Sequence, residues 1–260
     1  MNMKISLITV SLNAANTIKD CLDSVKAQGA GVEHIVVDGG STDGTIDIVL
    51  SRLSQIARFV SEPDGGIYDA MNKGIGMATG DIIGILNADD VFAAPDVVKR
   101  VREAFVDPSY DACYGDLLYV HQTDLNKVFR YWKSCQYSAN SFYLGWMPPH
   151  PSFFVRSRVY SKYGIFNPGI GTAADYELML RLLLKHKVPA IYIPHVLVRM
   201  RTGGKSNASI LNRLRANRMD RKAWKVNGLK PYPFTLAAKP LRKIGQFLTK
   251  GPHLPPMEAL

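Results

Sequence analysis

The sequence predicts an α/β fold in which helices flank a mostly parallel sheet, followed by a basic helical extension. Strand and helix signals alternate singly through the first hundred residues, which is typical of βαβ units. A polar cluster follows each of four predicted strands, at residues 11–13, 38–43, 62–64 and 87–90. Ligands in such sheets bind outside the carboxyl ends of the strands. The sequence therefore predicts one polar, ligand-binding edge built from four strand ends.

The first half of the chain supplies the elements of this sheet. Short apolar runs predict strands, whereas Ile18, Leu22 and Val25 recur at helical spacing, with Asn16 or Thr17 as the expected cap. Another helix is expected to open at Pro95, because proline is favoured in the first helical turn. The expected strands are 4–10, 34–38, 57–62 and 81–86, and the expected helices are 16–28, 46–53, 66–78 and the segment from residue 95.

From about residue 110 the pattern changes to one typical of antiparallel strands and longer helices. The expected strands are 111–120, 127–132, 152–157, 190–194 and 195–201, and the expected helices are 174–187, 208–228 and 233–250. We divide the chain into a domain over residues 1–206, with halves at 1–109 and 110–206, and a basic helical extension over residues 207–260.

The composition is that of a globular protein, with 260 residues, of which 47% are hydrophobic and 21% charged. No apolar run reaches the roughly 18 residues that a membrane-spanning helix needs. The stretch MNMKISLITVSLN is expected to be a strand, not a signal peptide. Cys21, Cys113 and Cys135 are odd in number and form no CxxC motif, so we expect reduced thiols and a cytoplasmic location.

The net charge of +10 is unevenly distributed along the chain. Residues 1–198 hold 18 basic and 20 acidic side chains, whereas residues 199–250 hold 14 basic side chains and one acid, Asp220. Such a segment favours an anionic partner, which can be a lipid headgroup, a phosphorylated ligand or a nucleic acid. We expect no nucleic acid, because the acids at the polar edge would repel its phosphates.

Large apolar side chains are interleaved with the basic residues of this extension. Their spacing suits a segment that lies on the anionic inner face of the cytoplasmic membrane. The alternative is a solvated basic face on helices that pack against the core. The apolar residues in question are Trp224, Leu229, Tyr232, Phe234, Leu241, Ile244 and Phe247.

Two glycine-rich stretches resemble phosphate loops and fail as such. GGSTDGT has no lysine after its second spaced glycine, and GIGMATG lies inside a helical pattern. A nucleotidyltransferase that forms sugar nucleotides is an alternative enzyme class for this α/β pattern. It would usually carry a glycine-rich basic loop after its first strand, and here that loop is SLNAANT.

The stretch GDIIGILNADD ends an apolar strand on two adjacent acids, Asp89 and Asp90. Hard divalent cations such as Mg²⁺ or Mn²⁺ prefer oxygen ligands and share phosphate oxygens of nucleotides. The alternative is that both acids are ordinary loop residues near the next helix. Asp38, at the end of the second strand, can either accept hydrogen bonds from a base or ribose or organise an Asx-turn.

Three further residues have a functional and a structural interpretation. Asp175 follows Thr172 by three positions, which fits a helix capping box, but it can also serve as a general base facing a cleft. His150, in PPHPSFF, can bind an acceptor or pack at the surface. Lys205, in MRTGGKS, can close on a diphosphate or belong to a plain hinge.

Five stretches in order resemble the family 2 glycosyltransferases, which are inverting enzymes with the GT-A fold. The stretches are LITVSLNAANTIKDCLDSV, IVVDGGSTDGT, SEPDGGIYDAMNKGIGMATGDIIGILNADD, HPSFFVR and ADYELMLRL, within residues 4–206. The GT-A fold is a Rossmann-like, mostly parallel sheet flanked by helices. The long EPDGGIYDAMNKGI block is most similar to bacterial enzymes that build O-antigen, capsule or exopolysaccharide.

The resemblance implies roles for particular residues. Residues 1–109 would bind the nucleotide-sugar and residues 110–206 the acceptor. Asp175 would be the catalytic base, Asp90 would bind the metal, and Asp89 would contact the ribose or the metal. The family pattern usually places an acid where Asn87 stands, which leaves the division between Asp89 and Asp90 open. The remaining implied nucleotide-sugar contacts are Thr9, Ser11, Asn13, Asp38, Asp64, Asn72 and Lys73.

The resemblance also implies the reaction and its partners. A sugar would pass from a nucleotide-sugar, expected to be a UDP-sugar, to a saccharide or lipid-diphosphate-linked acceptor in a single inverting displacement. Mn²⁺ or Mg²⁺, with Lys205 or Lys73, would stabilise the leaving diphosphate. A non-catalytic nucleotide- or carbohydrate-binding relative remains an alternative at this stage.

Overall fold

The computed structural model describes residues 3–203, 210–248, 251–252, 254 and 256. Its strands are β1 (Ile5–Ser11), β2 (Val32–Asp38), β3 (Arg58–Ser61), β4 (Ile82–Ile85), β5 (Asp90–Phe92), β6 (Ala112–Val120), β7 (Val128–Trp132), β8 (Phe154–Arg156) and β9 (Ala190–Arg201). Its α-helices are α1 (Ile18–Lys26), α2 (Thr45–Leu50), α3 (Ile67–Met77), α4 (Val97–Ala104), α5 (Ala139–Tyr143), α6 (Ser157–Tyr163), α7 (Ala174–Met179), α8 (Ile210–Val226) and α9 (Thr235–Leu248). Short 3₁₀ or π turns are η1 (Leu53–Gln55), η2 (His150–Ser152), η3 (Pro168–Ala173) and η4 (Leu180–Lys185).

The strands of the described chain form one sheet in the order β3-β2-β1-β4-β8-β6-β9-β5, with β7 paired to β6. The first part, from β3 to β4, is parallel, as the alternation of strands and helices predicts. The β6–β9 pair is also parallel, whereas β8, β5 and β7 pair antiparallel to their neighbours. The α/β fold expected from the sequence is confirmed.

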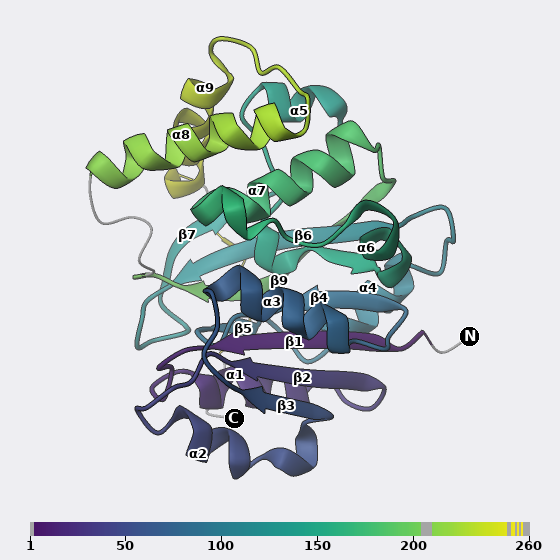
Figure 1. Cartoon of the computed structure of the whole chain (residues 1–260), viewed down its shortest axis with the longest axis vertical. Helices are drawn as coiled ribbons and strands as arrows, with labels where there is room; N and C mark the ends of the chain where they lie inside the picture. The colour runs from purple at the N-terminus through teal and green to yellow at the C-terminus, as the bar shows by residue number, and fades with distance from the viewer. Residues whose placement is uncertain (1–2, 204–209, 249–250, 253, 255, 257–260) are drawn as a thin grey trace.

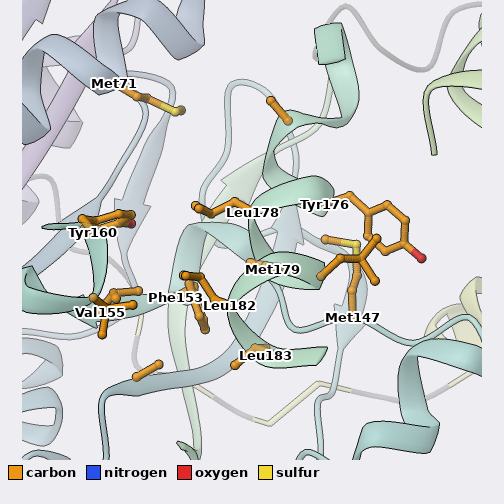
Figure 2. Packing of buried hydrophobic residues seen from close by; sticks show 14 of the residues in the cluster. Met71, Met147, Phe153, Val155, Tyr160, Tyr176, Leu178, Met179, Leu182 and Leu183 are labelled. Atoms are coloured by element: carbon orange, nitrogen blue, oxygen red, sulfur yellow. The ribbon is translucent and has the colours of Figure 1, made fainter. Parts of the chain in front are cut away.

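The central strands β1 and β2 are buried along almost their whole length because helices cover both faces of the sheet (Figure 1). In β1, Ile8 and Val10 belong to one core cluster, and Ile5 and Leu7 to the cluster on the other face. Figure 2 shows part of the first cluster, in which Leu178, Met179 and Leu182 of α7 and η4 meet aromatic residues such as Phe153 and Tyr160. Because both faces of the sheet are covered, these strands reach the surface only at their ends.

The structure departs from the expected strands at two places, and it adds two helices, α5 and α6, that the sequence did not predict. Residues 190–194 and 195–201, expected as two strands, form the single strand β9. Asp90, expected in a loop, begins the short strand β5, which pairs with the end of β9. A three-residue strand has no periodicity of its own, so its existence depends on the partner strand.

Two helices, α8 and α9, occupy the basic region (Figure 1). Trp224 of α8 is fully buried, and its indole nitrogen donates a hydrogen bond of 2.9 Å to the hydroxyl of Tyr176 in α7. The expectation that Trp224 faces a membrane is therefore wrong, because this ring fills the space between α8 and α7. The domain boundary expected at residue 206 lies outside the described residues. No helix in the described part of the chain is both long and apolar enough to cross a membrane.

Candidate active site

The ends of β1, β2 and β3 meet at Asp38, as the sequence predicts for this edge. Ser11 pairs with Asp38, which in turn pairs with Ser61, so three strand ends lie side by side. Asp38 is fully buried and accepts hydrogen bonds from both serine hydroxyls, at 2.9 and 2.8 Å, and from Gly40 and Ser41. Burial favours a higher pKa for Asp38, but these hydrogen bonds outweigh it and hold the pKa below its usual range. In this arrangement Asp38 organises the turn after β2.

The loops beside Asp38 carry two of the other expected nucleotide contacts. Asn13 is exposed, has a left-handed backbone with a φ of 51°, and accepts a hydrogen bond from the amide of Thr42. Asp64 accepts a hydrogen bond from the amide of Gly66 and approaches Gly39 so closely that a Cβ there would lie 2.7 Å from its carboxylate. The structure thus brings Asn13 and Asp64 to the same edge.

Thr9 does not reach this edge. Its side chain is fully buried, and its hydroxyl lies 3.0 Å from Nε2 of His34. Burial lowers the pKa of His34 to about 4, so the ring is a neutral core residue at pH 7. The side chain of Thr9 is therefore part of the core and does not form part of the surface of the site.

The turn after β4 holds two adjacent acids in opposite environments. Asp89 is exposed, whereas Asp90 is fully buried. Burial, reinforced by the negative charge of Asp89, raises the pKa of Asp90 well above its usual range. Arg201 holds the turn in place, since its guanidinium donates to the carbonyl of Asp89 at 2.8 Å and to the carboxylate of Asp20.

Among the residues that the structure describes, two buried oxygen atoms in this turn have no hydrogen-bond donor, namely Oδ1 of Asn87 and Oδ1 of Asp90. An oxygen acceptor left without a partner is costly, and a hard divalent cation would satisfy it. With the exposed carboxylate of Asp89 beside them, these oxygens fit such a cation. The described residues contain no cluster of three or more His, Cys, Asp or Glu side chains that could hold a metal, so water and a ligand would complete the coordination.

Helix α3 carries Asn72 and Lys73, which the resemblance assigns to the nucleotide. The amide of Asn72 instead makes two hydrogen bonds of 3.0 Å to the backbone of Phe166 and holds that segment in place. Lys73 lies 2.9 Å from Glu62 and 3.8 Å from Asp69. Its ammonium group therefore sits among acids at the nucleotide edge. Lys205 lies outside the described residues.

Asp175 faces a pocket and does not cap its helix. The N-cap of α7 is Ala173, with no side-chain hydrogen bond, so the capping box with Thr172 is not formed. Instead, Oδ2 of Asp175 lies 3.2 Å from Nδ1 of His150, and the hydroxyl of Tyr68 donates to Oδ1 at 3.4 Å. The sequence indicated Asp175 and His150 as separate candidates but gave no sign that they form a pair.

Asn87, His150 and Asp175 line the same pocket, which has a volume of about 70 Å³. The pocket joins the turn after β4 to the start of α7, so the metal-side and base-side residues share one space. Apolar side chains complete it, and they include Ile67, Tyr68, Met71, Ile85, Pro151, Phe153, Tyr160, Phe166, Leu178 and Met179. A reacting group bound here would be shielded from water on most sides.

Two residues that position the site were missed from the sequence. Tyr68 contacts Asp175, and Arg201 fixes the turn that carries Asp89. Tyr68 stands inside the quoted IYDAMN stretch, but an aromatic residue on a helix gives no sign of its hydrogen-bond partner. Arg201 is one of fourteen basic residues in its segment, so charge alone does not single it out.

The mostly parallel sheet flanked by helices, with an acidic edge, is an α/β fold, and it matches solved structures with the GT-A fold over most of the chain. Residues 6–164 match the glycosyl transferase family 2, and the chain belongs to this family. It is therefore a glycosyltransferase. Membership of this family favours glycosyl transfer over the alternative, a nucleotidyltransferase that forms sugar nucleotides.

Named relatives and solved structures agree with this assignment. The PGL/p-HBAD biosynthesis glycosyltransferase of Mycobacterium bovis is 32% identical over 221 residues, which cover 79% of this chain and 80% of the relative. The mannosyltransferase of Pyrobaculum calidifontis in complex with GDP-Man and Mn²⁺ has a TM-score of 0.64 and 21% identity, over 91% of this chain and 69% of that chain. Staphylococcus aureus TarS 1–349 in complex with UDP-GlcNAc has a TM-score of 0.63 and 16% identity, over 95% of this chain and 72% of that chain.

Proposed function

We propose that the chain transfers a hexose or N-acetylhexosamine, with inversion, from a UDP-sugar to a hydroxyl group of a lipid-linked or saccharide acceptor. The acceptor would belong to bacterial surface polysaccharide synthesis. The observation that carries the proposal is the pocket in which Asp175, His150 and Asn87 meet. UDP-GlcNAc in the TarS structure and the biosynthetic role in the relative's name support the choice of donor and acceptor class.

Asp175 is the general base in this proposal. Its carboxylate accepts the proton of the acceptor hydroxyl while the hydroxyl oxygen attacks the anomeric carbon. The bond from that carbon to the diphosphate oxygen breaks on the opposite face, so the configuration inverts and the electron pair leaves with the nucleotide. Nδ1 of His150 and the hydroxyl of Tyr68 hold the two carboxylate oxygens, which fixes the base toward the pocket.

A divalent cation fits the turn after β4, and the mannosyltransferase structure was solved in complex with Mn²⁺. Asp89, with the unpaired oxygens of Asn87 and Asp90, would hold it. When bound, such a cation supplies positive charge to the phosphate oxygens of the leaving group. Lys73 adds a second positive charge at the same edge.

The decisive experiment replaces the proposed base. Asp175→Asn keeps the size of the side chain but removes its ability to accept a proton, so we expect turnover to fall roughly 10²- to 10⁴-fold. UDP affinity, measured by calorimetry, should stay near the wild-type value because Asp175 does not hold the nucleotide. Asp124→Asn, the same change in an exposed loop, is the control. Transfer by Asp175→Asn at a rate near that of the wild type would disprove the role of the base.

Association with an anionic membrane surface is a second proposal for the basic region. Tyr232 and Phe234 are exposed in the turn between α8 and α9. Beside them lies a pocket of about 670 Å³ whose lining includes Arg221, Lys225 and Lys230. Exposed aromatic side chains next to basic ones are typical of proteins that bind at a membrane interface. This pocket is separate from the one that contains Asp175.

A further inference from the structure

A row of four side chains crosses the second part of the sheet, beginning at the proposed metal turn. Asp90 of β5 pairs with Met200 of β9, Met200 with Tyr119 of β6, and Tyr119 with Arg130 of β7. Directly paired residues project from the same face of a sheet. Neighbouring strands are about 4.8 Å apart, so Arg130 lies about 14 Å from Asp90 across three strand spacings. The row therefore leads from the turn after β4 to the edge strand β7.

Tyr119 lies in the middle of this row, two strands away from Asp90. Burial raises its pKa, and the negative charges of Asp90 and Asp175 act in the same direction, while the positive charge of Arg130 opposes them. Trp132 stacks on Tyr119 with a centroid distance of 6.4 Å and an interplanar angle of 8°. The row therefore carries a pair of stacked aromatic rings between Asp90 and Arg130.

Arg130, at the end of the row, is a cation held by aromatic rings. Its guanidinium carbon lies 3.7 Å from the centroid of Tyr119 and 5.5 Å from that of Phe247. Within the described part of the chain, no carboxylate lies within 4.0 Å of it. A guanidinium stacked on a ring can still offer its planar N–H groups to a phosphate. Arg130 can therefore bind an anion at the edge strand β7.

Exposed apolar side chains lie directly beside this cation. Phe129 of β7 is 64% exposed and Phe247 of α9 is 54% exposed, and their rings meet edge to face at 5.7 Å. Val128 and Leu241, on the same two elements, are exposed as well. Large apolar groups that gather at a surface usually mark a binding site. A cation next to exposed apolar side chains matches a ligand with a phosphate at one end and an apolar chain at the other.

We propose that Arg130 binds a phosphate of the acceptor and that Phe129 and Phe247 bind the apolar chain attached to it. The acceptor is then a lipid-linked sugar phosphate, whose sugar hydroxyl reaches Asp175 along the Tyr119 and Trp132 surface. This inference rests on the proposed function. Of the two acceptor classes in that proposal, lipid-linked and saccharide, it keeps only the lipid-linked class. Arg130 acts as a specificity residue, because a saccharide without a phosphate would leave its guanidinium without a partner.

Binding of farnesyl phosphate tests the proposal without knowledge of the acceptor sugar. The protein is first saturated with UDP and Mg²⁺, so that the nucleotide site is filled, and binding is then measured by calorimetry. We expect Arg130→Met to weaken farnesyl phosphate roughly 10- to 100-fold, the loss of a charge-assisted bond, and Arg130→Lys to weaken it less. Lys99→Met, which removes a positive charge from an exposed position on α4, should have no effect.

Two further ligands separate the contributions of the phosphate and the chain. Phe129→Ala should weaken farnesyl phosphate but not inorganic phosphate, whereas Arg130→Met should weaken both. Equal affinity of the wild type and Arg130→Met for farnesyl phosphate would overturn the inference. So would a loss of UDP affinity in Arg130→Met, which would assign this residue to the donor. A wild-type protein that binds no UDP would instead contradict the proposed function itself, so the two failures are distinguishable.

Discussion

Asp89 and Asp90 show how the environment divides roles between neighbouring residues of the same type. Burying an unpaired carboxylate is costly, and the chain buries Asp90 completely while leaving Oδ1 of that side chain without a donor. Asp89 is exposed and its side chain is accessible to a ligand. A cation between them would offset both the burial and the repulsion. Of the two acids, Asp89 is the ligand that can be substituted without disturbing the core.

Asp89→Asn should remove the part of UDP affinity that depends on the metal. We expect Mn²⁺ to strengthen UDP binding at least roughly tenfold in the wild type and to have little effect in the variant, because the amide is a weaker ligand than the carboxylate. Calorimetry with Mn²⁺ and with EDTA measures the difference. Asp107→Asn, at another exposed position, should behave like the wild type. Equal UDP affinity of the wild type with and without Mn²⁺ would argue against the metal site.

Helix α3 is the element that connects the nucleotide edge to the pocket. Tyr68 in its first turn contacts Asp175, and Asn72 one turn later holds the backbone of Phe166. The helix packs closely on β1 because Gly74 faces Ile8, where an added Cβ would lie 2.3 Å from a methyl carbon. A small shift of α3 would therefore move Tyr68 and change its contact with Asp175.

Two glycines of α3 offer a matched test of this packing. Gly74→Ala should destabilise the protein by about 1–2 kcal/mol, since overpacking costs about 1–3 kcal/mol and alanine's better helix propensity returns up to about 1 kcal/mol. Gly76 has no atom within 4 Å of an added Cβ, so Gly76→Ala should stabilise by up to about 1 kcal/mol. Urea unfolding measures both changes. Equal effects of the two substitutions would contradict the close approach at Gly74.

On the scale of the whole molecule, the basic region is partly core and partly surface. Trp224 and Leu236 are buried, and Lys239 forms an ion pair of 2.8 Å with Asp220. Tyr232 and Phe234 remain exposed, and Arg221, Lys225 and Lys230 line the pocket beside them. The helices α8 and α9 thus stabilise the α7 side of the fold and also present an apolar, positively charged surface.

This surface should bind vesicles that contain anionic lipid. We expect the protein to float with phosphatidylglycerol vesicles at low salt, to be released as salt screens the charges, and to stay unbound with phosphatidylcholine vesicles. Replacing both Tyr232 and Phe234 with serine should reduce flotation, whereas Val106→Ser, at an exposed apolar position on the α4 side, should not. A protein that stays in the soluble fraction at low salt would refute the membrane proposal.

The strands and their polar ends were predictable because both signals are local. Apolar runs such as Ile5–Ser11 follow from burial on two faces, and parallel strands bring their carboxyl ends together. The pairing of β5 with β9, the contact of His150 with Asp175 and the position of Trp224 were not predictable, because each depends on segments far apart in the chain.

The sequence by itself determined the α/β class, the family and the acidic edge, because periodicity and ordered motifs carry that information. Only the tertiary structure decided how the acids are used. It surrounds Asp38 with five hydrogen-bond donors, buries Asp90, exposes Asp89, and directs Asp175 toward His150 rather than into a capping box. The physical reason is that a carboxylate's role depends on its burial and its partners, and both are set by residues distant in sequence.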